Sequence, residues 1–215
     1  MADGHYHSIR FDASACHGCM ACMRVCPTQA IRVRRGVAAM IEDRCIDCGE
    51  CIKACPKSAV VPLTASPDGL GRFDCTIAVP SPALYTQFDG EVTPGVILQA
   101  LKASGFDAVA TLSWAGEAVT RALELFLADY GGPVPLISSF CPSVVRLVQI
   151  KYPELVAQLL PILSPREVAA REAKRAAAEQ TGLPAERIHA VYVTPCPAKM
   201  VSIVDHPGME TSYID

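Results

Sequence analysis

Several features that would place the chain in a common functional class are missing from its sequence. Charged residues make up only 19%, and the formal net charge of −3 provides no basic surface for nucleic acid or an anionic membrane. No apolar stretch is long enough to cross a bilayer. The first residues, MADGHYHSIRF, show no basic segment followed by an apolar one, as a signal peptide would. We therefore expect no nucleic-acid partner, no membrane insertion and no secretion.

The sequence also offers no catalytic or nucleotide-binding motif. It has no glycine-rich phosphate loop, no nucleophile–base pair and no flavin site that we can identify. His17 is expected to face solvent inside a cysteine-rich loop. The remaining histidines form no recognisable ligand pair; they are His5, His7, His189 and His206.

Cysteine is abundant, and its spacing is informative. Eight of the eleven cysteines form two C-x2-C-x2-C-x3-C runs, each followed by proline and 29 residues apart. This spacing is typical of [4Fe–4S] cubanes, and the fourth cysteine of each run serves the other cluster. We predict a first cluster on Cys16, Cys19, Cys22 and Cys55. We predict a second cluster on Cys45, Cys48, Cys51 and Cys26.

Two other uses of these cysteines have to be considered. CxxC pairs also bind zinc, and many cysteines in a small secreted chain can form a disulfide framework. Zinc has no need of a third cysteine and a Cys-Pro tail in each run. Because clusters need thiolates, the cysteines also indicate a reducing compartment, and we expect a cytoplasmic protein.

The pattern of strands and helices predicts two domains joined by a linker. Residues 5–63 are expected to form an α+β, ferredoxin-like two-cluster domain, with strands at His7–Phe11 and Ile31–Arg34. Residues 64–72 are rich in turn-forming residues and are read as the linker. Residues 73–215 alternate strands with helices, which predicts an α/β domain with mostly parallel pairing.

Within the second domain, apolar runs and helix signals give the expected elements. The predicted strands are Cys75–Val79, Phe106–Leu112, Val134–Ser138 and Ile188–Val193. The predicted helices are Thr93–Ser104, Glu117–Tyr130, about 143–151, and one that a capping box at Ser164–Glu167 opens and Gly182 ends. The charged residues of this last helix are expected to form a solvated, salt-bridged face.

Two further cysteines are each followed by proline. Cys141 and Cys196 are both expected just after an apolar strand, at the edge where α/β folds place their sites. Taken alone, each is better explained as a small buried hydrophobic residue.

At these residues the chain resembles the catalytic domain of [FeFe]-hydrogenases. Ser138–Pro142 resembles that family's first signature and Thr194–Lys199 its second, while Val79–Pro82 resembles the segment in which a Pro-Ser pair lines the diiron pocket. Members of the family often carry an N-terminal two-cluster ferredoxin domain. The resemblance implies that Cys141 and Cys196 are two of four thiolates on a third [4Fe–4S] cluster tethered to a diiron centre.

The resemblance also assigns roles to two other side chains. Lys199 and Ser81 would donate hydrogen bonds to the cyanide ligands of the diiron centre, as an anionic ligand requires. The simpler alternatives are a solvated lysine near a helix start and a serine in a turn.

Departures from the family pattern leave enzyme activity open. Phe140 replaces the cysteine that passes protons, and Thr194 replaces a methionine. The signature with the last two ligand cysteines is absent, and Cys75 is expected only to pack. We therefore expect the N-terminal portion of a longer, sensory or otherwise divergent hydrogenase-like protein, in which electrons pass from redox partners through two clusters. The alternatives are a stand-alone ferredoxin-type electron-transfer subunit with an α/β docking domain, and a zinc-bearing structural protein.

Overall fold

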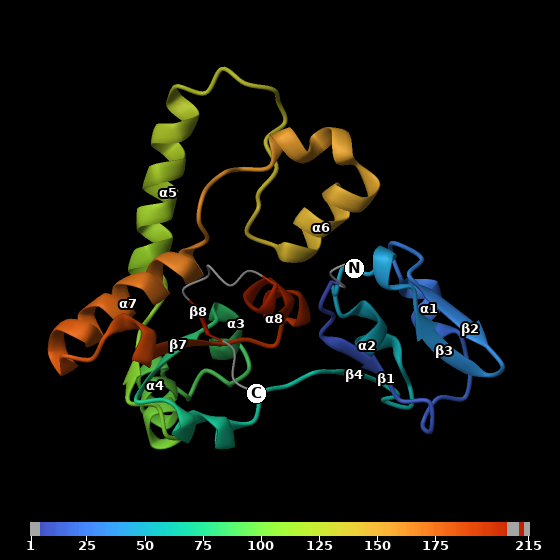
Figure 1. Ribbon diagram of the computed structural model, residues 1–215, viewed down its shortest axis with the longest axis horizontal. Helices are drawn as coiled ribbons and strands as arrows, with labels where there is room; N and C mark the ends of the chain where they lie inside the picture. The colour runs from blue at the N-terminus through green and yellow to red at the C-terminus, as the bar shows by residue number, and fades with distance from the viewer. Residues whose placement is uncertain (1–4, 206–210, 213–215) are drawn as a thin grey trace. The chain divides into compact units, whose positions relative to one another are not determined.

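The computed structural model describes residues 5–205 and 211–212, which form two compact units (Figure 1). Among these residues, the first unit comprises residues 5–64, 133–160 and 196–205, and the second comprises the rest. The first unit thus includes two segments, 133–160 and 196–205, of the domain expected at residues 73–215. The contiguous domains expected at residues 5–63 and 73–215 stay a prediction. None of the helices in the described part of the chain is both long and apolar enough to span a membrane.

The N-terminal part of the first unit consists of two short antiparallel strand pairs and two short helices. Strand β1 (Ile9–Phe11) pairs with β4 (Val60–Pro62), and β2 (Ile31–Arg34) pairs with β3 (Val37–Met40). Helices α1 (Ala21–Val25) and α2 (Glu50–Ala54) pack on each other. The buried core residues are Ile9, Cys22, Ile31, Ala38, Cys51 and Val60. This small core includes two of the cysteines that are predicted to bind clusters.

The rest of the first unit is helical. Helix α6 (Pro142–Lys151) packs against the 3-10 helix η3 (Pro153–Gln158) and against α8 (Pro197–Val204). A further 3-10 helix, η1 (Glu42–Arg44), lies in the N-terminal part, directly before the second cysteine run. The strand predicted at residues 134–138 is wrong, because the segment forms only an isolated bridge between Ile137 and Leu159. Pro133 and Pro135 have no N–H group to donate to a ladder, which explains the failure.

The second unit is built on a parallel sheet, which confirms the predicted α/β fold. Its strand order is β6-β5-β7-β8. The strands are β5 (Cys75–Pro80), β6 (Ala108–Val109), β7 (Ile188–Val193) and β8 (Thr211–Ser212). All six residues of β5 are buried, as expected of a central parallel strand. Strand β6 is much shorter than the predicted Phe106–Leu112.

Helices cover this sheet. Helix α7 (Pro165–Thr181) packs against β5 and β7, and α5 (Ser113–Ala128) packs against α7. The other helices are α3 (Pro82–Tyr85), α4 (Pro94–Ala103), η2 (Pro67–Arg72) and η4 (Ala185–Arg187). The core between α7 and the sheet contains Cys75, Ile77, Ala177 and Ile188. Cys75 therefore packs in the core, as predicted.

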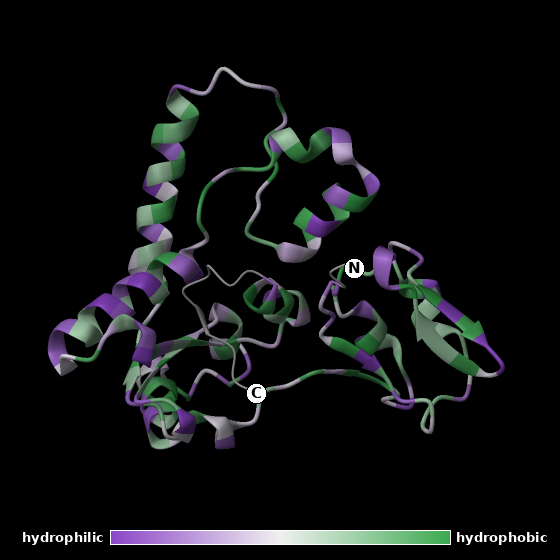
Figure 2. Cartoon of the chain, viewed as in Figure 1, coloured by the Kyte–Doolittle hydropathy of each residue, from purple (hydrophilic) through white to green (hydrophobic). Residues whose placement is uncertain are grey.

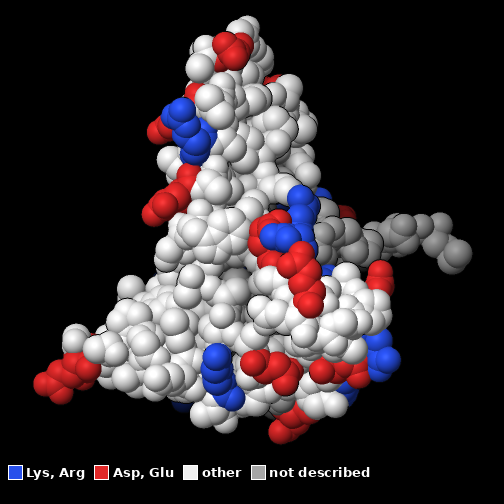
Figure 3. Space-filling model, turned by 90° about the vertical axis from the view of Figure 1, so that its left-hand side faces the viewer, with Lys and Arg blue, Asp and Glu red and all other residues white. Residues whose placement is uncertain are grey.

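Helix α7 departs from its sequence prediction at its N-terminal end. Ser164 makes no side-chain capping bond, and Glu167 is instead buried and paired with Arg166 at 2.7 Å. The capping box and the solvated role of this pair were therefore wrong predictions. Further along, Arg175 bridges the exposed Glu172 and Glu179, as predicted. Figure 2 shows α7 as predominantly hydrophilic. On the side of the molecule that faces the viewer in Figure 3, acidic and basic residues both occur at the surface.

Candidate functional site

The eight run cysteines line two cavities in the first unit. One cavity is lined by Cys16, Cys19, Cys22 and Cys55, among other residues. The other is lined by Cys26, Cys45, Cys48 and Cys51, again with other residues. Each cavity thus combines three cysteines of one run with the last cysteine of the other run, which is the grouping that the spacing predicts. Cluster ligation by each cysteine stays a prediction. The eleven cysteines, all among the described residues, form no disulfide.

The backbone of the two runs repeats residue by residue. Three pairs of equivalent positions, each 29 residues apart, have positive φ angles: Gly18 (72°) and Asp47 (49°), Met20 (63°) and Gly49 (81°), Gln29 (54°) and Ser58 (49°). Non-glycine residues rarely adopt this conformation, and it costs about 1–3 kcal/mol where they do. Loops with such turns direct successive N–H groups into a concavity that favours anions. The repeated conformation therefore suits loops that enclose anionic groups.

Backbone N–H groups donate to cysteine sulfurs in the same way in both repeats. Ala30 donates to Cys26 Sγ and Ala59 donates to Cys55 Sγ, each at 3.2 Å. Two longer contacts, both 3.4 Å, join the N–H of Ala38 to Cys16 Sγ and that of Asp47 to Cys45 Sγ. Hydrogen bonds to the sulfurs are one of the factors that set the reduction potential of an iron–sulfur cluster.

Burial acts against thiolates in these cavities. Loss of solvent raises the pKa of Cys45 to about 12, with a further increase from Asp47, and raises the pKa of Cys51 to about 12. Burial opposes ionisation of Cys55 as well, but N–H groups of Lys57, Ala59 and Val60 together lower the pKa of this thiol. Four clustered thiolates therefore need cationic metal to offset their charge. A set of four sulfur donors fits an iron–sulfur cubane.

Cys141 and Cys196 occupy equivalent local positions. Each directly precedes a helix that begins with proline, α6 and α8 respectively, and their backbone angles are nearly the same (φ −102°, ψ 110° and φ −98°, ψ 111°). Cys196 follows strand β7 in the chain, but Cys141 follows no strand, so that part of the prediction is wrong. Cys141 is exposed and Cys196 is half-buried.

The two predicted donors lie in different units. Ser81, at the end of β5, is buried, and its Oγ accepts from the N–H of Ala83 at 3.3 Å while its own N–H donates to Val193 O at 2.9 Å. Its contacts are those of a helix-capping serine. Lys199 is half-buried in the first turn of α8, in the first unit with Cys141 and Cys196. Their roles at a diiron centre stay predictions.

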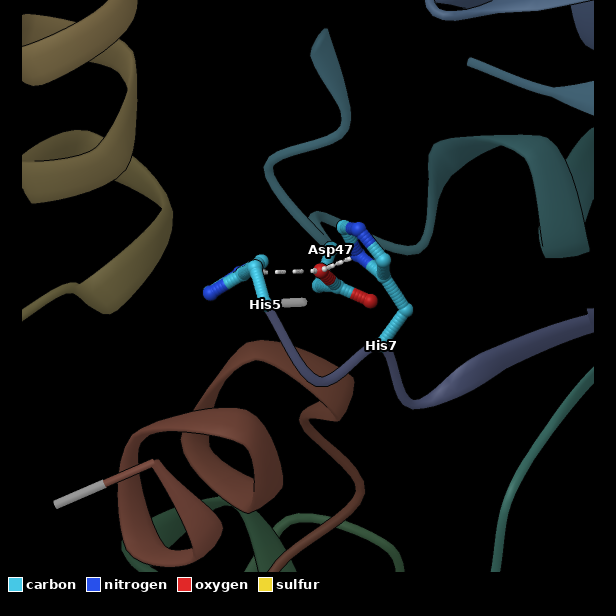
Figure 4. A group of neighbouring side chains, drawn as sticks. All are labelled: His5, His7 and Asp47. Carbon is cyan, nitrogen blue, oxygen red and sulfur yellow. Dashed lines mark hydrogen bonds and ion pairs between the residues drawn. The ribbon is translucent and has the colours of Figure 1, made fainter. Parts of the chain in front are cut away.

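One cluster of polar side chains was missed by the sequence analysis, which recognised no histidine pair. Asp47 lies between His5 and His7, with its Oδ2 atom 2.7 Å from His7 Nδ1 and 3.9 Å from His5 Nε2 (Figure 4). The available signal was the His-x-His spacing before β1. The contact with Asp47, forty residues away, had no sequence signature.

Comparison with known families places these sites in context. The model of the family "Iron only hydrogenase large subunit, C-terminal domain" matches residues 74–215, well over half of the chain. The chain belongs to this family. A "4Fe-4S dicluster domain" model also matches residues 8–56 of this hydrogenase-like protein, the segment that contains both cysteine runs. The protein therefore combines an iron–sulfur electron-transfer domain with a hydrogenase large-subunit domain, as predicted.

Curated relatives are hydrogenases that are longer than this chain. Iron hydrogenase 1 of Clostridium pasteurianum is 30% identical over 130 residues, which are 59% of the chain and 22% of that protein. The periplasmic [Fe] hydrogenase large subunit of Nitratidesulfovibrio vulgaris is 29% identical over 213 residues, 90% of the chain and 50% of that protein. The hydrogenase-like chain thus spans half or less of the length of these relatives.

A solved structure supports the fold. An [FeFe]-hydrogenase studied for its oxygen inactivation matches with a TM-score of 0.50 and 20% identity, over 67% of this chain and 43% of that chain. At this identity the match shows a shared fold for part of the chain and carries no information on activity.

Proposed function

We propose that the chain transfers electrons through two [4Fe–4S] clusters in a hydrogenase-like protein, and that redox proteins supply and accept these electrons. The observation that carries the proposal is the pair of cavities, each lined by four cysteines in the crossed grouping. A bound [4Fe–4S] cluster supplies one-electron redox chemistry. The cysteines would hold the cluster as ligands. The N–H groups of Ala30 and Ala59, which donate to the sulfurs of Cys26 and Cys55, would influence its reduction potential.

The proposal extends to a third cluster and a diiron centre only in part. Cys141 and Cys196 would supply two thiolates, whereas a cubane in this family's arrangement takes four, and Cys75 is buried in the core of the other unit. Lys199 and Ser81 remain the candidate donors to a diiron centre. Phe140 has no group that can pass a proton. We therefore propose that these 215 residues alone do not turn over hydrogen.

A second candidate function rests on the same count of cysteines. Because only the two N-terminal cavities have four cysteines, the chain could serve as a ferredoxin-type electron-transfer subunit, with the parallel α/β unit as its docking domain. In either case we propose a cytoplasmic location on the basis of cysteine usage, although one relative is described as periplasmic.

The test is iron and acid-labile sulfide per chain in anaerobically purified protein, with EPR of the reduced form. The electron-transfer proposal expects about eight irons and a coupled two-cluster signal. Cys141→Ser and Cys196→Ser, which lie outside both cavities, should leave both readings unchanged. About twelve irons in the wild type, falling to about eight in these variants, would show a third cubane and overturn the restriction to two clusters. A colourless, zinc-containing protein would overturn both candidate functions.

A further inference from the structure

The side chains of His5, His7 and Asp47 form a cluster that the proposed function does not use. Its two histidines line neither cysteine cavity, whereas Asp47 also lines the cavity of Cys45 and Cys51. We propose that these three residues bind a divalent transition-metal ion, with Zn²⁺ as the probe, through two imidazole nitrogens and one carboxylate oxygen. The site adjoins the second cysteine run through Asp47, whose N–H donates to Cys45 Sγ, but its proposed ligand atoms are not cysteine sulfurs. All of its residues belong to the first unit.

The spacing of the ligand atoms is close to that of a metal site. The atoms that the three side chains offer lie within 4.8 Å of one another. Zinc bonds to nitrogen and oxygen of about 2.0–2.2 Å in a tetrahedron place the ligand atoms roughly 3.3 Å apart. The contacts of Asp47 Oδ2 to His7 Nδ1 and His5 Nε2, 2.7 and 3.9 Å, lie on either side of this value. Side-chain shifts of about half an ångström would bring both Asp47 contacts to this value. The ligand nitrogens of the two histidines, which lie within 4.8 Å of each other, would also have to approach.

The second ring nitrogen of His5 is held as metal-bound histidines usually are. His5 Nδ1 lies 2.6 Å from Asp205 Oδ2, and the N–H of Tyr6 donates to Asp205 Oδ1 at 3.3 Å. A carboxylate that accepts from one ring nitrogen leaves the lone pair on the other, which here is Nε2 on the side of Asp47. The pair of Asp205 and His5 thus leaves Nε2 of His5 to bind an ion. Figure 4 shows the contact between His5 and Asp47.

His7 is an unusual residue to bury for structural reasons alone. Its side chain is 3% exposed, and within the described residues its Nε2 atom has no hydrogen-bond partner. An unsatisfied buried polar atom costs about 1–3 kcal/mol. A metal ion would take the place of the proton between Nδ1 and Asp47, with release of that proton on binding. The metal bond would then offset the cost of burying the ring.

The charge around the cluster favours a cation. Asp47 is 2% exposed, and its other oxygen, Oδ1, accepts from the N–H of Ser8 at 3.0 Å, which fixes the carboxylate. Burial lowers the pKa of His5, and Arg146 and His7 lower it further against the opposing effect of Asp205 and Asp47. A metal ion binds the neutral form of an imidazole. The two carboxyl groups beside His5, those of Asp47 and Asp205, exceed in number the single nearby cation, Arg146.

The experiment uses the full chain with its iron–sulfur content intact, prepared anaerobically and dialysed against micromolar free Zn²⁺. We expect a single zinc per chain with unchanged iron. His5→Gln and His7→Gln should each reduce zinc affinity by at least about tenfold, and Asp205→Asn by about 10–100-fold, because it orients His5. His189→Gln, which changes a histidine in the other unit, is the matched control and should bind as the wild type does. If His7→Gln does not fold, His5→Gln carries the test, because this side chain is 26% exposed.

X-ray absorption at the zinc edge distinguishes this site from the cysteine runs. The proposal requires nitrogen and oxygen ligands at about 2.0–2.2 Å with imidazole scattering. Sulfur at about 2.3 Å would place the zinc on cysteines and overturn the proposal. Failure of the wild type to retain zinc, or equal uptake by the wild type and His5→Gln, would also overturn it. These outcomes do not depend on the iron content, which tests the electron-transfer proposal separately.

Discussion

The two cysteine loops have the same backbone conformation but stabilise it in different ways. Gly18 and Asp47 are equivalent, and both have positive φ. A Cβ atom at Gly18 would lie 2.8 Å from the carbonyl oxygen of Gly36, so only glycine fits there. At the equivalent position of the second loop, the Asp47 carboxylate accepts hydrogen bonds from His7 and from the N–H of Ser8. The first loop thus needs a residue without a side chain at position 18, whereas the second is held by the hydrogen bonds of the Asp47 side chain.

The next pair of equivalent positions shows the reverse order. Met20 has an exposed side chain in the first loop, whereas a Cβ atom at Gly49 in the second would lie 3.2 Å from Pro197 Cγ. Glycine therefore occurs where another segment approaches the loop, Gly36 in one case and Pro197 in the other. The cysteine spacing determines the backbone, and the neighbouring segments determine which residue occupies each position.

The largest expected effect comes from removing a buried cysteine from either loop. Cys22→Ser and Cys51→Ser should each lose about four of eight irons and destabilise the first unit, because its small core includes both thiols. Iron, sulfide and urea unfolding measure the effect. If the loops are equivalent, the two losses are similar, and Cys75→Ser in the second unit retains all iron. A Cys51→Ser variant with full iron content would contradict the assignment of Cys51 as a cluster ligand.

Exchanging the residues at the equivalent positions tests the difference between the loops directly. Gly18→Asp should cost about 3 kcal/mol or more, because the new side chain meets a backbone carbonyl. Asp47→Gly should cost about 1–3 kcal/mol for each buried donor left unsatisfied, at His7 and at Ser8. Urea unfolding at matched iron content gives both values. Wild-type stability of Gly18→Asp would show that the approach of Gly36 does not constrain the loop.

The same contrast explains what could be predicted from the sequence. The cysteine grouping follows from spacing alone, and β5 and β7 follow from apolar runs that are buried in a parallel sheet. The predicted strand at residues 134–138 failed, because its prolines limit pairing to a single bridge. The His5–His7–Asp47 cluster could not be predicted, since it depends on a contact between distant segments. Features that depend on local spacing could be predicted from the sequence, whereas polar contacts between distant segments could not.

A smaller effect is expected from alanine at the second pair of positions. Gly49→Ala should cost about 1–2 kcal/mol, because alanine is strained at positive φ and its Cβ atom meets Pro197. Met20→Ala should change the free energy of unfolding by no more than about 0.5 kcal/mol, since both residues pay the same backbone cost and the side chain is exposed. Urea unfolding of the two variants measures the difference. Equal costs would mean that Pro197 does not restrict the second loop.

The smallest effect concerns acid, and it compares the two units. Burial lowers the pKa of His5 in the first unit and of His189 in the second. Below the unfolded value of about 6.5, the unfolded chain binds more protons than the folded one, so stability falls as pH decreases from about 6.5 through the folded pKa. Thermal midpoints from about pH 8 to about pH 5.5 should therefore decline less in His5→Gln and His189→Gln than in the wild type. A decline confined to the wild type and His189→Gln would mean that His5, and not His189, makes the protein acid-sensitive.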